Sequence, residues 1–285
     1  MACGDAWAMT VLPHSHRPSW SRFPGIGFAL PRGPLDLVRQ VLIVSVFDIV
    51  YELSRVVAVG DRSDALRHAR SVVHTEQSLG IFRELSVQRF VAHAPGVLSH
   101  VANWTYFNAQ FTITFSFLLW AYLFRNDRFT TVRNAIIAAD AIGVVGYVLY
   151  PTAPPRMLTD MGFTDTLNQT AVNNHSSVIS ALSNPYAAMP SLHTAYALIL
   201  GVSGVVLARH RWTKAIWALY PALVVFSIVA TANHFFLDAM AGAAVATAAG
   251  STALLLLPRM RPALSWAGGR CRSASPTPPA HSRGW

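Results

Sequence analysis

Charged residues are scarce in this sequence of 285 residues. Only 12% of the residues are Asp, Glu, Lys or Arg, against about 25% in soluble proteins. At the same time 53% are hydrophobic, and the mean hydropathy is +0.37. A chain with so little charge is neither intrinsically disordered nor a coiled coil. The composition predicts an integral membrane protein instead.

Cysteine and lysine are also nearly absent. Cys3 and Cys271 lie in the two polar terminal segments without the spacing of a metal or redox motif, which excludes a disulfide-stapled secreted domain. Lys214 is the single lysine among 22 basic residues. Although the formal net charge is +9, the arginines lie between apolar runs rather than on one basic face. We therefore expect no nucleic-acid partner.

Apolar segments long enough to cross a membrane recur along the chain. A spanning helix needs about 20 mostly apolar residues, and six segments approach this length: 38–59, 104–124, 135–150, 192–208, 215–232 and 235–257. The first is the weakest, because Asp48, Glu52 and Arg55 interrupt it. Their i, i+4, i+7 spacing would place them on one stripe facing the bundle. The sequence predicts an all-α integral membrane bundle of six transmembrane helices.

The polar segments outside these spans differ in character. Residues 61–100 alternate charged and apolar residues at helical spacing, which predicts one or two amphipathic helices on the membrane surface. Residues 151–190 are rich in Pro, Thr, Asn and Ser and predict an extramembrane loop. We divide the chain into a cytoplasmic tail at 1–36, a catalytic membrane domain at 37–257 and a disordered basic tail at 258–285. Prolines interrupt the first forty residues, so we expect no cleavable signal peptide.

The distribution of basic residues predicts the orientation. With six crossings, residues 57–100 and 151–190 share one side with the turn near Asn233. Arginines are fewer on that side than on the opposite side, which holds both tails. The positive-inside rule then puts both tails in the cytoplasm and the long loops outside it. The dominance of Arg over Lys and the high alanine content are typical of high-GC bacteria, which indicates a plasma membrane; a Golgi-type location is the alternative.

Three polar patches fall on the outer side, at residues 150–156, 188–193 and 231–238. His234 and Asp238 are spaced i, i+4. In a helix the carboxylate would accept the proton of one imidazole nitrogen and leave the other as a nucleophile or base.

The second patch predicts a helix start. Pro190 begins a helix without wasting a backbone donor, and the N-terminus behind Ser191 offers N–H groups to an anion. With His193 and Arg156, the patches supply two imidazoles, a carboxylate, a hydroxyl and a guanidinium. Such a set suits phosphoryl transfer, where catalysis rests mostly on positioning and charge stabilisation.

The motifs resemble a known family. Pro190-Ser191-Leu192-His193 followed by His234-x-x-x-Asp238 resembles the second and third signature motifs of the type 2 phosphatidic acid phosphatase superfamily of membrane lipid phosphatases and phosphotransferases. The wider wording Ala-Met-Pro-Ser-Leu-His, with Asn-His-Phe-Phe-Leu-Asp and Pro-Thr-Ala-Pro-Pro-Arg, is similar to the branch containing inositol phosphorylceramide synthases and their bacterial relatives. The resemblance is best over residues 133–257 and looser over 76–88.

The resemblance implies a role for each matching residue. His234 would be the nucleophile that forms a phosphohistidine, Asp238 its orienting partner and His193 the general acid. Ser191 and Arg156 would hold the phosphate oxygens of a lipid phosphate or phospholipid substrate. The implied mechanism needs no metal and no other cofactor.

Two family cations are missing from this chain. Leu149 stands where the family's first motif has a lysine, and Ile228 stands where its third motif has an arginine. Arg55, Arg62 or Arg133 would then complete the phosphate site. Arg133 lies on the opposite side in the predicted topology, so Arg55 is the best candidate.

Several alternatives stay open. Water as acceptor makes the protein a phosphatase, whereas an alcohol such as inositol makes it a head-group transferase. A metal-dependent membrane hydrolase would use His193, His234 and Asp238 as ligands, and a transporter would also place ionisable residues among its spans. We expect Asp140 to be a bundle-facing polar contact and Tyr106 to belong to an interfacial aromatic belt.

Overall fold

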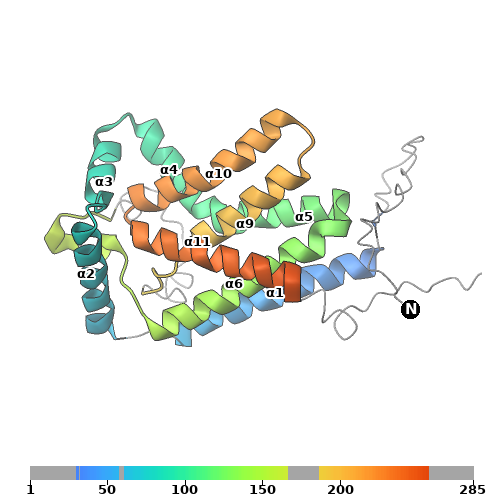
Figure 1. Ribbon diagram of the computed structural model, residues 1–285, viewed down its shortest axis with the longest axis horizontal. Helices are drawn as coiled ribbons and strands as arrows, with labels where there is room; N and C mark the ends of the chain where they lie inside the picture. Colours follow the sequence, from blue (N-terminus) through green and yellow to red (C-terminus); the bar gives the residue numbers. More distant parts are fainter. Residues whose placement is uncertain (1–29, 32, 58–60, 166–185, 257–285) are drawn as a thin grey trace, which may run out of the picture.

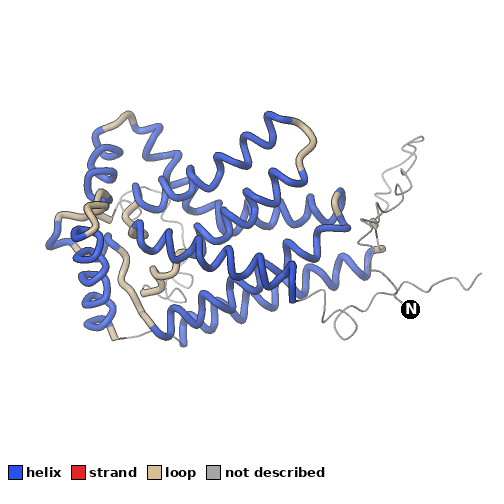
Figure 2. The backbone as a smooth tube through the Cα atoms, in the orientation of Figure 1, coloured by secondary structure: helices blue, strands red, loops and turns tan. Residues whose placement is uncertain are grey.

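The computed structural model describes residues 30–31, 33–57, 61–165 and 186–256. Most of both predicted tails, with both cysteines, lies outside these ranges. Within them the regular structure is helical, apart from one isolated parallel bridge between Thr152 and Ala187. Figure 2 shows the helices and the loops that join them.

Six helical rods form a bundle along the long axis of the molecule (Figure 1). They are α1 (Pro34–Val57), α4 (Gly96–Asn108) continued by the π-turn η1 (Ala109–Ile113) and α5 (Thr114–Phe124), α6 (Asn126–Leu149), α9 (Leu192–Leu207), α10 (Arg211–Ala230), and α11 (Phe236–Ser251) continued by η4 (Thr252–Leu256). This confirms the predicted all-α membrane bundle.

Four of the rods are long and apolar enough to cross a membrane: Gly96–Phe124, Asn126–Leu149, Arg211–Ala230 and Phe236–Leu255. The span predicted at 135–150 begins earlier, because the polar residues from Asn126 onward form its first turns. Helix α1 has 24 residues, but its charged residues keep it outside this group.

The short helix α9 occupies the centre of the bundle. Its 16 residues rise about 24 Å, less than the roughly 30 Å of a hydrocarbon core. It packs against α6, α10 and α11, and most of its side chains are buried. Gly204 allows a close approach, since a Cβ atom there would lie 2.2 Å from the Trp217 ring. Burial by neighbouring helices explains how a short helix stays inside the bundle.

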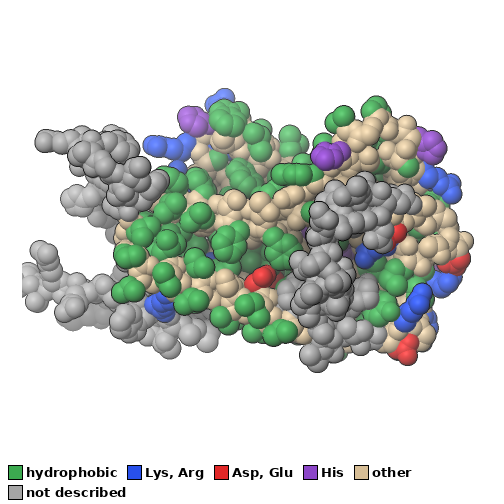
Figure 3. All heavy atoms as spheres, turned by 180° about the vertical axis from the view of Figure 1, so that it is seen from behind, with side chains coloured by type: hydrophobic (Ala, Val, Ile, Leu, Met, Phe, Trp, Pro, Cys, Tyr) green, Lys and Arg blue, Asp and Glu red, His purple; other side chains and the backbone are tan. Residues whose placement is uncertain are grey.

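Large hydrophobic side chains cover the outside of the rods (Figure 3). Val206, Trp212 and Leu219 are each about two-thirds exposed. A soluble protein rarely exposes so much contiguous apolar surface, so these side chains face lipid in a membrane protein.

Two amphipathic helices lie across one end of the bundle (Figure 1). Helix α2 (Arg62–Ser78) begins at Asp61, whose carboxylate accepts a hydrogen bond from the Ser63 N–H at 2.7 Å. Its buried face carries Ala65, Ala69 and Val72 at helical spacing. Helix α3 (Glu84–His93) follows. The prediction of one or two amphipathic helices is confirmed by α2 and α3, and their direction across the bundle suits an interfacial position.

Candidate active site at one end of the bundle

The three polar patches of the sequence meet at the end of the bundle covered by α2 and α3. The segment after α6 runs beside the segment before α9, with hydrogen bonds from the Thr152 N–H to the Tyr186 carbonyl (2.8 Å) and from the Ala188 N–H to the Thr152 carbonyl (3.1 Å). The Arg156 N–H donates to the Ala232 carbonyl at 2.9 Å. Backbone hydrogen bonds therefore join residues that are far apart in the sequence.

The start of α9 is held by neighbours on both sides. Ser191 is the N-cap, and its hydroxyl accepts a hydrogen bond from the Thr194 N–H at 3.4 Å. Its own N–H donates to the Asp238 carbonyl at 3.0 Å. The Tyr147 hydroxyl donates to the Pro190 carbonyl at 3.1 Å. Pro190 precedes the cap rather than filling the first helical position as predicted, and Ser191 is fully buried.

His193 lies in the first turn of α9 between two rings. It stacks on Tyr106 of α4, with 4.7 Å between ring centroids and 18° between ring planes. The centroid of the His234 ring lies 5.6 Å away on a ring tilted by 60°. The two imidazoles of the second and third patches therefore lie close together. Tyr106, which we assigned to an aromatic belt, contacts His193 instead.

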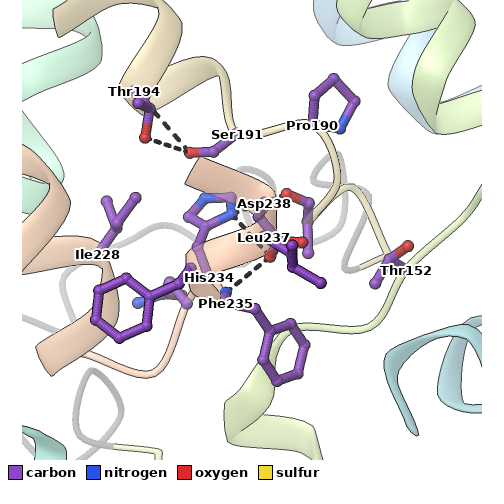
Figure 4. A network of polar contacts seen from close by, with 12 residues as sticks. Thr152, Pro190, Ser191, Thr194, Ile228, His234, Phe235, Leu237 and Asp238 are labelled. Carbon is purple, nitrogen blue, oxygen red and sulfur yellow. Dashed lines mark hydrogen bonds and ion pairs between the residues drawn. The ribbon is translucent and has the colours of Figure 1, made fainter. Parts of the chain in front are cut away.

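His234 is held through its Nδ1 atom (Figure 4). Nδ1 lies 2.8 Å from the carbonyl oxygen of Ala188 and 3.5 Å from Oδ2 of Asp238. A carbonyl oxygen only accepts hydrogen bonds, so Nδ1 carries the proton and the neutral ring has its lone pair on Nε2. The Ala188 carbonyl is thus closer to Nδ1 than the Asp238 carboxylate, which was the predicted partner of the imidazole.

Asp238 also caps the helix that follows His234. Helix α11 begins at Phe236, so His234 lies before the helix and not within it as the i, i+4 argument assumed. Asp238 Oδ2 accepts a hydrogen bond from the Phe235 N–H at 2.8 Å, drawn as a dashed line in Figure 4. Asp238 still reaches the imidazole, because the capping turn folds its side chain back toward His234.

Arg156 lies beside the residue that precedes His234. It belongs to a short 3₁₀-helix, Pro155–Met157, and its guanidinium donates a hydrogen bond to the side-chain oxygen of Asn233. Its Nε lies 3.8 Å from Oδ2 of Asp165. The arginine therefore contacts the turn that leads into His234. Arg55 lies in the last turns of α1, and the position of its side chain lies outside what the structure describes.

Two buried glutamates near the site escaped the sequence interpretation. Glu76 of α2 and Glu84 of α3 are fully buried, and both accept hydrogen bonds from the start of α11. Burial raises the pKa of Glu76 to about 9, and the neighbouring Glu84 carboxyl adds to the shift. The sequence signal was the place of Glu76 on the apolar face of an amphipathic helix.

A cavity of about 280 Å³ lies deeper in the bundle, among α1, the α4–α5 rod, α6 and α9. Its walls are mostly apolar, and they include the half-exposed Phe111 and Phe115. Asp140 lines it and accepts a hydrogen bond from the Tyr196 hydroxyl, which confirms Asp140 as a bundle-facing polar contact. Tyr196 follows His193 by one helical turn.

Among the described residues, no group of three or more His, Cys, Asp or Glu side chains is arranged to hold a metal ion.

Comparisons with known proteins agree with the motifs. A family model described as the PAP2 superfamily matches residues 70–252. A phosphoinositol dihydroceramide synthase of Bacteroides thetaiotaomicron is 27% identical over 135 residues, which are 42% of this chain and 44% of that protein. The chain thus spans less than half the length of this curated relative. The crystal structure of Aquifex aeolicus LpxE matches 62% of this chain and 93% of its own, with 18% identity and a TM-score of 0.45.

Proposed function

Because the chain belongs to the PAP2 superfamily, we propose that it is a membrane enzyme that cleaves the phosphate ester or phosphodiester of a lipid through a phosphohistidine on His234. The observation that carries the proposal is the pairing of His193 and His234. Their ring centroids lie 5.6 Å apart, and the Ala188 carbonyl holds Nδ1 of His234 so that the lone pair is on Nε2.

The first half-reaction forms the covalent intermediate. Nε2 of His234 attacks phosphorus, and the bond between phosphorus and the lipid-side or head-group oxygen breaks. The protonated imidazole of His193 gives its proton to the leaving oxygen, which departs as an alcohol. Asp238 stabilises the positive charge that develops on the His234 ring, since its carboxylate lies 3.5 Å from Nδ1.

The second half-reaction returns the enzyme to its starting state. Neutral His193 takes a proton from water or an acceptor alcohol, whose oxygen attacks phosphorus. The phosphorus–nitrogen bond breaks, and His234 becomes neutral again. In both steps Arg156 and the N-terminus of α9 at Ser191 hold the phosphate oxygens, and Arg55 is our candidate for a further cation.

The cavity beneath the site supports a lipid substrate. Tyr196, which lines the cavity, follows His193 by one helical turn. The half-exposed Phe111 and Phe115 also line it. We propose that the substrate's hydrocarbon reaches the site from the bilayer along these apolar walls. The excess of basic residues on the opposite side supports an active site outside the cytoplasm, with the protein in the plasma membrane.

Head-group transfer is the second candidate. The matched relative is named as a phosphoinositol dihydroceramide synthase, and the Ala-Met-Pro-Ser-Leu-His wording favours the same branch. In that case a lipid hydroxyl replaces water as acceptor, and a phosphoinositol group is transferred.

A lipid panel in detergent tests both candidates. The purified protein is given phosphatidic acid, phosphatidylinositol and a ceramide, singly and together, with and without free inositol. Released phosphate indicates a phosphatase, and a new inositol phospholipid indicates a transferase. Turnover should persist in chelator and vanish in His234→Ala. Loss of turnover in chelator with recovery in zinc would favour a metal hydrolase, and uptake into proteoliposomes without chemical change would favour a transporter.

A further inference from the structure

The first turn of α11 is tied to two helices that lie outside the bundle. The N–H of Phe236 donates to Oε1 of Glu84 at 2.9 Å, and the N–H of Leu237 donates to Oε1 of Glu76 at 2.7 Å. Oδ2 of Asp238 accepts a hydrogen bond from the N–H of Phe235 at 2.8 Å. The three consecutive N–H groups after His234 therefore each end on a carboxyl group, and we name Glu76, Glu84 and Asp238 the carboxyl cap.

The carboxyl cap joins segments that are distant in the sequence. Glu76 and Glu84 precede the residues they bind by 161 and 152 positions. In Figure 1, α2 and α3 lie beside the start of α11. A helix start ordinarily leaves its first N–H groups to water or to a local side chain. Here buried groups from two other helices fix its position.

The carboxyl cap binds the N–H groups of the first three residues after the proposed nucleophile. His234 immediately precedes the three capped N–H groups, and its own N–H is bonded to the Ile228 carbonyl at 3.2 Å. Its imidazole then reaches the Ala188 carbonyl at 2.8 Å. A displaced first turn of α11 would move Nε2 relative to phosphorus, and a misplacement of about 1 Å is enough to cost on the order of 10²-fold in rate.

Helix α2 also holds the segment that carries Arg156. The Ala153 N–H donates to the Ala65 carbonyl at 3.1 Å, and Nδ1 of His68 lies 2.8 Å from the Pro151 carbonyl. Helix α2 thus contacts both the first turn of α11, which follows His234, and the segment that carries Arg156.

We propose that Glu76 and Glu84 are positioning residues for the His234 nucleophile, holding the first turn of α11 in register with α9 and the Arg156 segment. The inference rests on the proposed function for its kinetic consequences, whereas the hydrogen bonds it concerns are independent of the reaction.

The charge state of the cap follows from its burial. Glu76, Glu84 and Asp238 are all fully buried, and neighbouring buried carboxylates cannot all be ionised. Glu84 accepts two hydrogen bonds, from the N–H groups of Phe236 and Arg83. Glu76 uses Oε1 for Leu237, and its buried Oε2 has no hydrogen-bond partner among the described residues. Oδ1 of Asp238 is likewise buried without a hydrogen-bond partner among the described residues. Burial and the neighbouring Glu84 carboxyl raise the pKa of Glu76 to about 9, so we expect Glu76 to be the neutral member at pH 7.

A glutamine at position 76 imitates this neutral acid. The groups facing Glu76 are Glu84 of α3 and Asp238 of α11, with His234 next to the same turn. In the wild type, ionisation of Glu76 at alkaline pH adds a charge beside these carboxylates and weakens the support of His234. Glu76→Gln keeps an acceptor for the Leu237 N–H and cannot ionise.

The kinetic test compares Glu76→Gln, Glu76→Ala and Glu84→Ala with the wild type over pH 6 to 10, on the lipid found active in the panel. We expect both alanine variants to lose on the order of 10- to 100-fold in kcat with little change in KM. We expect Glu76→Gln to keep near-wild-type kcat at neutral pH and to show a smaller alkaline decline than the wild type, because only the part caused by loss of the His193 proton should remain. Asp64→Asn is the matched control on α2, because its ion pair with Arg67 is exposed and far from the cap; it should not differ from the wild type.

Hydrogen–deuterium exchange tests the geometry without any reaction. The amides of Phe236 and Leu237 should exchange slowly in the wild type, in Glu76→Gln and in Asp64→Asn, and faster in both alanine variants. Unchanged protection in the alanine variants would overturn the proposal whatever the enzyme catalyses. Wild-type kcat in folded Glu76→Ala, or an alkaline decline in Glu76→Gln equal to that of the wild type, would overturn it as well. An inactive wild type with the expected exchange pattern would instead refute the proposed function alone.

Discussion

The carbonyl oxygen of Ala188 lies 2.8 Å from Nδ1 of His234 and thereby connects the segment before α9 to the turn before α11. This contact fixes the tautomer of the imidazole, because the carbonyl can only accept. The ring that this contact holds has its centroid 5.6 Å from that of His193. A backbone acceptor thus helps to set the relative position of two histidines that are 41 residues apart in the sequence.

Removing the proposed general acid should slow the enzyme without stopping it. We expect His193→Ala to lower kcat by on the order of 10² to 10⁴-fold. The loss should shrink with a p-nitrophenyl phosphate ester, since that leaving group departs without a proton. Steady-state kinetics on both substrates measures the difference. An equal loss on both would contradict the role of acid.

Asp238 should contribute separately to catalysis and to stability. Asp238→Asn keeps an oxygen for the Phe235 N–H but removes the negative charge near His234, so we expect kcat to fall on the order of 10²-fold. Asp238→Ala also removes the cap, which should cost about 1 kcal/mol of the free energy of unfolding. Thermal unfolding in detergent, run beside the kinetics, separates the two effects. Wild-type kcat in Asp238→Asn would be the contrary result.

Close packing at Gly242 should be essential for the start of α9. A Cβ atom at this position would lie 2.2 Å from the Ser191 carbonyl oxygen, whereas one at Gly250 of the same helix would meet nothing within 4 Å. Gly242→Ala should therefore destabilise the protein by about 1–3 kcal/mol and lower activity by displacing Ser191. Gly250→Ala is the control and should be neutral or slightly stabilising. Similar melting temperatures for the two variants would show that the contact is unimportant.

The titration of Glu76 should make stability fall as pH rises. Its pKa is raised from 4.5 to about 9 in the folded protein, so the folded state binds a proton that the unfolded state has released. The stabilising contribution is complete below about pH 4.5 and is lost as pH rises toward 9. Unfolding measured at pH 6 and pH 9 should show a smaller difference for Glu76→Gln than for the wild type. Equal differences would mean that Glu76 does not titrate in this window.

The sequence predicted which polar residues lie together better than it predicted their contacts. His193, His234 and Asp238 stand in recognisable motifs, and counting spans was enough to place them at one end of the bundle. The Ala188 carbonyl could not be predicted in the same way, because every residue has a carbonyl and only the fold selects one.

The position of His234 outside α11 had a readable signal that the helical interpretation overlooked. An acidic residue three positions after a helix cap is a frequent capping pattern, and Asp238 follows Phe235 by three. Glu76 and Glu84 were harder to assign, since their partners lie more than 150 residues away and an acidic residue on an amphipathic helix is ordinarily a solvated one. Tyr106 is an aromatic residue of the kind found in interfacial belts. Its contact with His193 is revealed only by the fold, in which α4 packs against α10 and the continuing turn η1 packs against α9.

The most direct test of the phosphohistidine is to trap it. The protein is mixed with a lipid substrate labelled with ³²P in the transferred phosphoryl group, quenched in alkali within milliseconds to seconds, and separated from lipid. We expect label on the wild-type protein that is stable in alkali and released by acid, as a phosphorus–nitrogen bond requires, and none on His234→Ala. Labelling of His234→Ala at the wild-type level, or turnover of the wild type without any labelled protein at any quench time, would contradict the account.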